Sequence, residues 1–467
     1  MIRRRRFAAS ARPARRWTLW RGACQPREVI AAAAAVTRAA LQLLLCSVPA
    51  FAQPATPGPP LQLADLQQAA IASDPRTREL TLLESQSSLR QANLSRQWYP
   101  STSVESLVQY QTDAPTTPLL TADGKPFFSA PKDNYDVYGR IEQRLWDPGV
   151  GAQSAVERAQ LAEQQARVRT AVFAVRQQVN DAFFAAATLQ QRLNVVTATI
   201  TELEGRLREA NARVQEGTAV RSDAGAIEAT LLQRQQDADE LRANMRGALA
   251  RLATIVGRPI PTDAVPAVPD LAVQFSRVRD QLQTLRLRPE YEQFAKTRDR
   301  IATQQEVTGA QSQPKVTAFG RIGFGRPALD FIQNEWEAYG VGGVRLQWNA
   351  WNWGTTGRER EAQKLQSEIT SSEEAAFARS IAAGVEGDLA TIEHLTRALA
   401  TDQRIIDLRA DVERTARVRL QEGVLTSSDY LARDTEPLQA RIAQATHQVE
   451  LAEARARVLT TIGAEVR

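Results

Sequence analysis

The chain has few cysteines, histidines and methionines, the residues that most often supply a thiol nucleophile, an imidazole base or a soft-metal ligand. Cys24 and Cys46 are the only cysteines, His394 and His447 are the only histidines, and Met245 is the only methionine beyond the first residue. Both histidines fall in segments with a helical pattern and have no partner motif, and the chain contains no phosphate-binding loop. This inventory disfavours an enzyme. It also disfavours a soft-metal site, which needs Cys, His or Met ligands, so we expect no catalytic residue, metal or cofactor.

One short pattern occurs twice. The chain reads RVQEGTAVRSDA at 213–224 and RLQEGVLTSSDY at 419–430, and Gly217 and Gly423 lie 206 positions apart. Both copies share Arg, Gln-Glu-Gly and Ser-Asp in the same order, and both lie between long segments with an apolar stripe. We therefore expect two helix–turn–helix connections, each with its glycine just past the end of the first helix.

Each turn also presents a carboxylate. Asp223 and Asp429 fall in the first turn of the helix that follows, where a negative charge is stabilised. Ser222 or Ser428 would serve as the N-cap of that helix. In an ordinary connection between helices these side chains would do no more than stabilise the turn.

Residues 1–52 have the pattern of a secretory signal peptide. They hold ten Arg and one Glu, then the apolar run ALQLLLCSVPAFA, which is too short to span a bilayer as a retained helix. Cys46 follows Leu45, where a lipoprotein signal needs a small residue, so we expect cleavage after Ala52. Without this segment no cysteine remains, and the net charge changes from +5 to about −4. A chain with this charge is not expected to bind nucleic acid.

The second half of the sequence resembles the first. Besides the turns, three matches recur in the same order: Asp74-Pro75 with Arg288-Pro289, Trp146-Asp147-Pro148-Gly149 with Trp351-Asn352-Trp353-Gly354, and Gly257 with Gly463. Such internal similarity predicts tandem repeats of one unit. We divide the chain into a signal peptide (1–52), an N-terminal linker (53–62), repeat one (63–257), a Pro-rich linker (258–275) and repeat two (276–467).

Long helices dominate each expected repeat. Apolar residues recur in alternating steps of four and three from Val168 to Val214, which is a coiled-coil seam. The seam resumes at 227–255 and is rougher at 392–420. A helix over 152–216 would be roughly 98 Å long, and helices over 63–98 and 222–256 would be roughly 54 and 52 Å long. Two short helices stacked end to end would therefore match one long helix.

Four segments alternate in the manner of strands, at 101–110, 137–145, 316–324 and 336–348. Each is about long enough to cross a bilayer as a tilted strand. Four strands cannot close a barrel, and open sheet edges are not tolerated in lipid, so several chains would have to combine their strands. The alternative is a small soluble sheet at the end of a coiled coil. Six tryptophans lie at or near the strand ends, as an aromatic girdle would: Trp98, Trp146, Trp336, Trp348, Trp351 and Trp353.

Taken in order, these features resemble the TolC-like outer-membrane efflux proteins. The resemblance rests on the duplicated unit, the seams, the Pro-terminated entries WYP and SQP to the first strand of each repeat, and the Glu-Gly…Ser-Asp turns. The segment LQLADLQQAAIASDP at 61–75 is similar to the mature N-terminus of that family. The likeness covers essentially all of 61–467, and it lies in the order and duplication of motifs rather than in any single one.

The resemblance implies a homotrimer in the outer membrane with a long periplasmic extension. The fold would be mainly α with a small β part: tandem-repeat helical hairpins forming an α-helical barrel, with four strands per chain in a 12-stranded transmembrane β-barrel. Such a trimer is a passive exit duct of a tripartite efflux or secretion system. Its partners would be outer-membrane lipid, a periplasmic adaptor (membrane fusion) protein and an inner-membrane RND or ABC pump.

The resemblance also gives the turns a role, since they would be the periplasmic tips of the hairpins. The residues that would contact the adaptor are Gly217, Thr218, Ala219, Val220, Gly423, Val424, Leu425 and Thr426. Asp429, with its counterpart Asp223, would lie at the periplasmic mouth and favour cations. The polar links that hold this mouth shut in the family would fall at Leu420 and Leu425, so closure here would depend on other contacts.

The sequence leaves one alternative open, a periplasmic coiled-coil structural protein without a pore. It also leaves open what is exported and which class of pump supplies the energy.

Overall fold

The computed structural model describes residues 60–467, except positions 125, 283, 285, 331, 333, 423, 426 and 467; the side chains of 421, 427–429 and 431–435 are also outside the description. The predicted signal peptide at 1–52, with both cysteines, and most of the expected linker at 53–62 therefore lie outside the described residues. The part from Pro57 to the C-terminus forms one compact unit, which is described by itself below.

Helix makes up 66% of the described residues and strands a small part. The described helices are α2 (Leu63–Ser73), α3 (Thr77–Arg96), α4 (Pro148–Phe173), α5 (Val175–Gln215), α6 (Arg221–Val256), α7 (Ala272–Arg279), α8 (Pro289–Ala310), α9 (Thr355–Gln421) and α10 (Ser427–Ile462).

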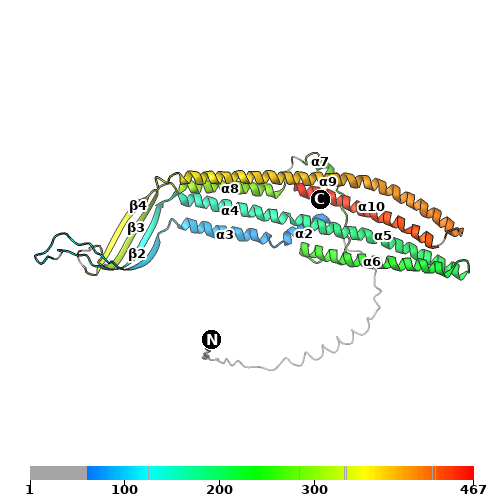
Figure 1. Cartoon of the computed structure of the whole chain (residues 1–467), viewed down its shortest axis with the longest axis horizontal. Helices are drawn as coiled ribbons and strands as arrows, with labels where there is room; N and C mark the ends of the chain where they lie inside the picture. The colour runs from blue at the N-terminus through cyan, green and yellow to red at the C-terminus, as the bar shows by residue number, and fades with distance from the viewer. Residues whose placement is uncertain are drawn as a thin grey trace, which may run out of the picture. The chain divides into compact units, whose positions relative to one another are not determined.

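The long helices lie side by side in four columns (Figure 1). Near the sheet the packing order is α3, α4, α8, α9, and away from the sheet it is α6, α5, α10, α9. The α4–α5 pair and α9 run through both halves, whereas α6 lies beyond α2 and α3, and α10 lies beyond α8. Two shorter helices therefore lie end to end beside each long column, as predicted from the helix lengths.

Two predicted helices are interrupted. The expected helix at 63–98 is two helices, since Asp74 accepts a hydrogen bond from the backbone N–H of Arg76 (2.8 Å) and begins a turn at Pro75. The expected helix at 152–216 begins at Pro148 and divides at Ala174. The backbone of Ala174 stays near helical values (φ −61°, ψ −21°), so this break is a local tightening and the two pieces remain continuous in direction.

The main core lies where the stacked helices meet. Phe183 and Phe184 on α5 are fully buried and pack edge to face with ring centroids 5.3 Å apart. They lie in one cluster with apolar side chains of α2, α6 and α10, including Leu66, Leu252 and Leu459. The seam predicted from Val168 is buried as far as Leu203, with partly buried positions between. It thus joins α5 to its neighbours.

Four strands form one antiparallel sheet in the order β1 (Ser101–Tyr110), β2 (Asp133–Trp146), β3 (Lys315–Arg326) and β4 (Glu337–Gln347). All four strands expected from the alternation are present, with ends shifted by a few residues. The central pairing joins β2 to β3, which are far apart in the sequence. One end of every strand connects to the helices, and at the other end lie the two loops at 111–132 and 327–336.

Candidate functional site

The two faces of the sheet differ in chemistry. The register places Glu105, Tyr138, Gly323 and Tyr339 in one cross-strand row, and the next row on the same face holds Arg140 and Arg321. This face, which we call the polar face, also carries the charged residues Asp136, Glu142, Arg144, Lys315, Glu337 and Arg345. The alternation predicted from the sequence puts the polar side chains here.

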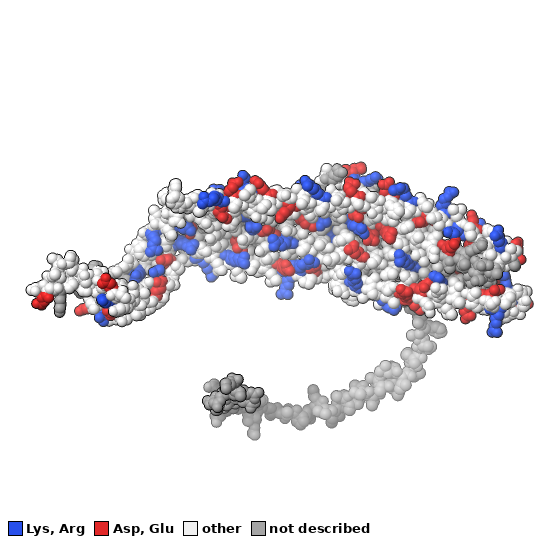
Figure 2. All heavy atoms as spheres, viewed as in Figure 1, with Lys and Arg blue, Asp and Glu red and all other residues white. Residues whose placement is uncertain are grey.

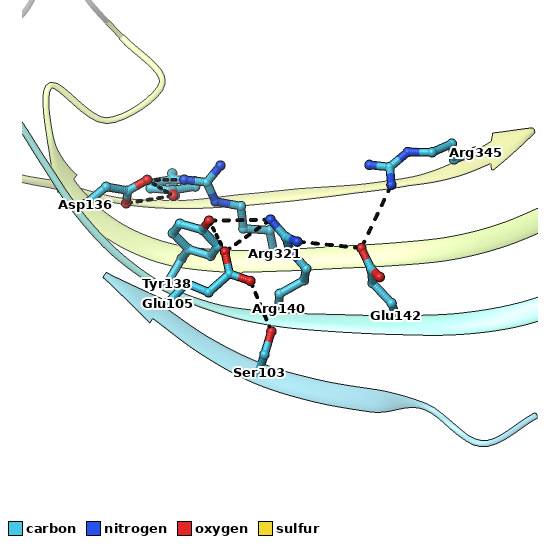
Figure 3. Close-up of polar contacts among 9 residues, drawn as sticks. Ser103, Glu105, Asp136, Tyr138, Arg140, Glu142, Arg321 and Arg345 are labelled. Atoms are coloured by element: carbon cyan, nitrogen blue, oxygen red, sulfur yellow. Dashed lines mark hydrogen bonds and ion pairs between the residues drawn. The ribbon is translucent and has the colours of Figure 1, made fainter. Parts of the chain in front are cut away.

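The charged groups of the polar face are linked across all four strands (Figure 3). Arg321 forms an ion pair with Asp136, which also accepts a hydrogen bond from the hydroxyl of Tyr339 (2.8 Å). The Arg321 guanidinium lies over the ring of Tyr138, 3.6 Å from its centroid. The hydroxyl of Tyr138 in turn donates to Glu105. The network uses residues from both halves of the chain and fixes the central pairing of β2 with β3.

The opposite face is apolar and lies open to the surroundings. Val104 is 82% exposed and Ile322 73% exposed, both near the middle of their strands. Further exposed apolar side chains on this face are Val108, Val137, Ile141, Phe324, Val344 and Leu346. An apolar patch of this extent marks a surface that contacts a partner or a membrane.

Both edges of the sheet are also open. β1 pairs only with β2, and β4 only with β3, within the described residues. Edge strands of 10 and 11 residues offer rows of unpaired backbone N–H and C=O groups, which favour pairing with another strand. A single copy of this chain therefore leaves both the apolar face and the two edges without partners.

Other classes of site find no support in the described residues. No group of three or more His, Cys, Asp or Glu side chains is placed to hold a metal ion there. No helix in the described ranges is long and apolar enough to cross a membrane. Figure 2 shows Lys and Arg interspersed with Asp and Glu over the visible face of the helices, with no single-sign field covering it.

No family model and no curated protein matches the sequence. Solved structures do match. The outer membrane protein VceC from Vibrio cholerae has a TM-score of 0.60 at 13% identity, covering 87% of this chain and 97% of that one. CusC, which forms a transmembrane channel, has a TM-score of 0.60 at 13% identity, covering 89% of this chain and 99% of that one. The open state of the Neisseria gonorrhoeae MtrE outer membrane channel has a TM-score of 0.59 at 16% identity and coverage of 87% and 89%.

In each comparison the similarity extends over nearly the whole length of both chains and includes the helices as well as the sheet. This chain has the fold of the TolC-like outer-membrane channels.

In this outer-membrane channel fold the first turn is well defined. Gly217 has a left-handed backbone (φ +73°) just past the end of α5. Its N–H donates to the C=O of Val214 (3.1 Å) and the N–H of Thr218 to the C=O of Arg213 (2.9 Å), which is the Schellman pattern. Gly217, Thr218 and Val220 are exposed and Ala219 is half-buried.

The second turn repeats part of this pattern. The N–H of Val424 donates to the C=O of Arg419 (2.9 Å), at positions equivalent to Thr218 and Arg213. Val424 is exposed and Leu425 half-buried, while Gly423, Thr426 and the side chain of Asp429 lie outside the described residues. The helices that follow, α6 and α10, each have 36 residues and start 206 positions apart.

The predicted serine N-cap of the first turn is wrong. α6 begins at Arg221, so its N-cap is Val220, which has no side-chain hydrogen bond to offer, and Ser222 already lies inside the helix. Asp223 falls in the first turn as expected, half-buried. The exposed isopropyl group of Val220 occupies the position where a soluble helical hairpin would favour Ser, Thr or Asp.

The tryptophans lie at the sheet ends. Trp98, Trp146, Trp348, Trp351 and Trp353 are close to where the strands meet the helices, and each is at least 39% exposed. Trp336 lies at the loop end, where it stacks on Phe324 with centroids 5.5 Å apart and contacts Tyr135. The six tryptophans lie at or near the strand ends, as predicted, and their place in aromatic girdles at the membrane interfaces stays a prediction.

Near the turns, a polar cluster that no sequence pattern predicted joins the two hairpins. Glu413 on α9 accepts hydrogen bonds from Arg206 of α5 (3.0 Å), Arg417 (2.7 Å) and the Tyr430 hydroxyl of α10 (2.9 Å). Burial raises the pKa of Glu413, but the hydrogen bonds from Arg417 and Tyr430 and the charges of Arg417 and Arg206 outweigh it and leave the pKa below its usual value. Burial also raises the pKa of Tyr430 to about 12. Leu420 and Leu425 pack against Tyr430 in the adjoining apolar cluster.

His447 has a partner that was also missed. Its Nδ1 lies 2.6 Å from a carboxylate oxygen of Asp402, across the α9–α10 hairpin. The two residues are nearly equidistant from the turn at 423, as are Glu413 and Tyr430. In an antiparallel hairpin such pairs face each other, so the turn position was the signal that could have found both contacts.

Proposed function

We propose that this chain is a subunit of a passive outer-membrane channel that extends into the periplasm. The observation that carries the proposal is the sheet, which has a continuous charged face, an exposed apolar face and two open edges. In a membrane barrel the apolar side chains face lipid and the polar ones face the lumen. In that orientation, the network of charged side chains on the polar face (Figure 3) lines a water-filled pore.

The oligomer that closes such a barrel is a homotrimer. Three copies would supply twelve strands, an even number within the range of bacterial barrels, and β1 of one copy would pair with β4 of the next. The helical layer has matching free edges, since α3 and α6 form one edge and α9 the other. Exposed apolar side chains lie on these helices: Leu82, Leu89, Leu232, Leu365, Ile369, Leu408, Val412 and Val418. Packing one copy against the next would cover them.

The turns at 217–220 and 423–426 are proposed to contact a periplasmic adaptor. Support comes from the exposed apolar side chains Val220 (65%) and Val424 (73%) at the tips of both hairpins. The adaptor would in turn connect the channel to an inner-membrane pump. Asp429, by its sequence position beside the second turn, is proposed to form one ring of carboxylates at the periplasmic mouth.

Reconstitution into planar lipid bilayers tests the proposed function. We expect stepwise conductance from detergent-extracted protein, and a cation preference that falls in Asp429→Asn. If cation preference and block by divalent ions are unchanged in this variant, the proposed Asp429 ring is wrong, but the proposed channel is not contradicted. Complete absence of conductance, with the protein in the soluble periplasmic fraction, would contradict the channel and leave a coiled-coil structural protein.

A further inference from the structure

An open cavity of about 500 Å³ lies where the polar face of the sheet meets the helices. It is lined by the end of α3, the start of β1 and the helix-proximal parts of β2, β3 and β4. Six charged side chains line it: Arg96, Arg144, Lys315, Arg345, Glu142 and Asp147. Four of the six are cations, so the cavity has a net positive charge, and Figure 2 shows several Lys and Arg side chains close together at this junction.

The two carboxylates do not neutralise the cations. Asp147 lies 3.5 Å from Arg144 and 3.7 Å from Lys315, and it also accepts a hydrogen bond from the backbone N–H of Gly149 as the N-cap of α4. Glu142 lies 3.9 Å from Arg345. All three ion pairs are longer than a charge-assisted hydrogen bond of about 2.7–2.9 Å. Each cation therefore keeps hydrogen-bonding capacity for another acceptor.

The cations are accessible from the cavity. The side chains of Arg144, Lys315 and Arg345 are 45%, 39% and 58% exposed, whereas that of Asp147 is 8% exposed. Arg144 is held in place by a hydrogen bond to the side chain of Gln97 (2.6 Å), and Arg345 by the ring of Phe319, 5.0 Å from its guanidinium. Arg144 and Arg345 are thus oriented by neighbouring side chains, while Asp147 is largely covered and Glu142 is less exposed (34%) than any of the three cations.

We propose that this cavity is a binding site for an oxyanion, such as the phosphate, sulfonate or carboxylate group of a passing molecule. Planar guanidinium groups suit bidentate contact with such groups, and Lys315 adds a point charge. The role of the site in transport rests on the proposed function, because only in the trimer does the polar face line a lumen. Three copies would then form a basic belt where the barrel joins the helices, opposite in sign to the acidic mouth.

Binding is measured first, without a bilayer. Pyrophosphate is titrated by calorimetry into the full-length protein in detergent at low salt, where ion pairing is least screened. We expect the double variant Arg144→Gln/Lys315→Gln to bind about tenfold more weakly, because two charge-assisted contacts are lost. Arg242→Gln, which removes an exposed cation on α6, is the matched control and should bind like the wild type.

A variant that is expected to strengthen binding distinguishes a loss of binding contacts from damage to the fold. Glu142→Gln removes the carboxylate beside Arg345 and should strengthen pyrophosphate binding, roughly threefold, whereas a misfolded cavity would weaken it. The proposal is overturned if the wild type does not bind, if the double variant binds as tightly as the wild type, or if Arg242→Gln loses as much affinity.

Single-channel recording then tests the belt. Pyrophosphate should block wild-type conductance, and half-maximal block of the double variant's own conductance should need about tenfold more pyrophosphate. If the wild type and the double variant conduct and are blocked equally, the proposed belt is wrong but the proposed channel is not contradicted. If pyrophosphate binds but no variant conducts, the proposed channel is wrong but the proposed oxyanion site is not contradicted.

Discussion

Glu413 holds together three helices from both hairpins with one carboxylate. It accepts hydrogen bonds from Arg206, Arg417 and Tyr430, and the guanidinium of Arg206 also lies over the Tyr430 ring, 5.3 Å from its centroid. Because the carboxylate is largely buried, removing its charge leaves Arg206 and Arg417 to share Glu202, at 2.5 and 3.6 Å, as their remaining anionic partner. This cluster lies near the turns, where the polar links expected from the family are replaced by Leu420 and Leu425.

We predict that Glu413→Gln destabilises the protein at pH 7 by about 1–3 kcal/mol. The lowered pKa of Glu413 sets the pH dependence: its contribution is complete above the unfolded value of 4.5 and is lost as pH falls through the lower folded value. Thermal unfolding followed by circular dichroism in detergent should show a difference between variant and wild type that shrinks below pH 4.5. A difference that is constant from pH 7 to pH 3 would show that the charge does not matter.

At the residue scale, the sequence showed where charged side chains lie in helices and strands more readily than which residues they contact. The aspartates of the turns and the alternating charges of the strands were visible because they follow a local period. The partners of Glu413 and His447 depend on which helices pack together, a property that no local pattern encodes. The ion pair of Asp136 with Arg321 depends on the register of two strands far apart in sequence, for the same reason.

At the scale of elements, the first turn depends on its glycine. Gly217 has φ +73°, where an L-residue is strained, although an added Cβ would meet no atom within 4 Å. We predict that Gly217→Ala destabilises the hairpin by about 1–2 kcal/mol through backbone strain alone. Gly225→Ala is the matched control, because Gly225 lies in α6 with equally open space and ordinary helical geometry.

That control should stabilise the protein by about 0.5–1 kcal/mol, since alanine is the better helix former. Thermal unfolding of the two variants therefore shifts in opposite directions. Equal shifts would mean that the left-handed turn is not needed in the folded protein.

The two faces of β1 give a second test at this scale. Val104 is 82% exposed on the apolar face, and Leu107 is 43% exposed on the polar face in the row of Asp136. We predict that Val104→Lys prevents stable assembly in the outer membrane, because a lysine facing lipid costs about 2–4 kcal/mol near the bilayer midplane. Leu107→Lys should be tolerated, since its charge would face the lumen near Asp136.

The measurement is the amount of each variant in the outer-membrane fraction. If both variants reach the membrane equally, the faces are assigned wrongly or the sheet does not lie in lipid.

Helix and strand types were predictable from the sequence because both periods are sustained over long segments. The strand ends moved by a few residues, and the breaks at Asp74 and Ala174 were missed. Pro75 gave a local signal for the first break. Ala174 has no helix-breaking chemistry, so no local signal in the sequence marks the second break.

At the scale of the whole molecule, the order of the helical columns could be expected only in outline. Lengths alone indicated that short helices stack against long ones, but which column neighbours which is decided by burial of Phe183, Phe184 and the residues around them. The open edges and the exposed apolar face show what one copy lacks. They are the physical reason for proposing that the chain functions as an assembly.

The most direct test of that proposal is the mass of the assembly. Protein extracted by detergent from the outer-membrane fraction is measured by light scattering, with the detergent contribution subtracted. We predict a stable particle containing three copies, whose mass does not fall on dilution. A monomer or dimer, or recovery of the protein from the soluble periplasmic fraction, would contradict the shared barrel and the channel that depends on it.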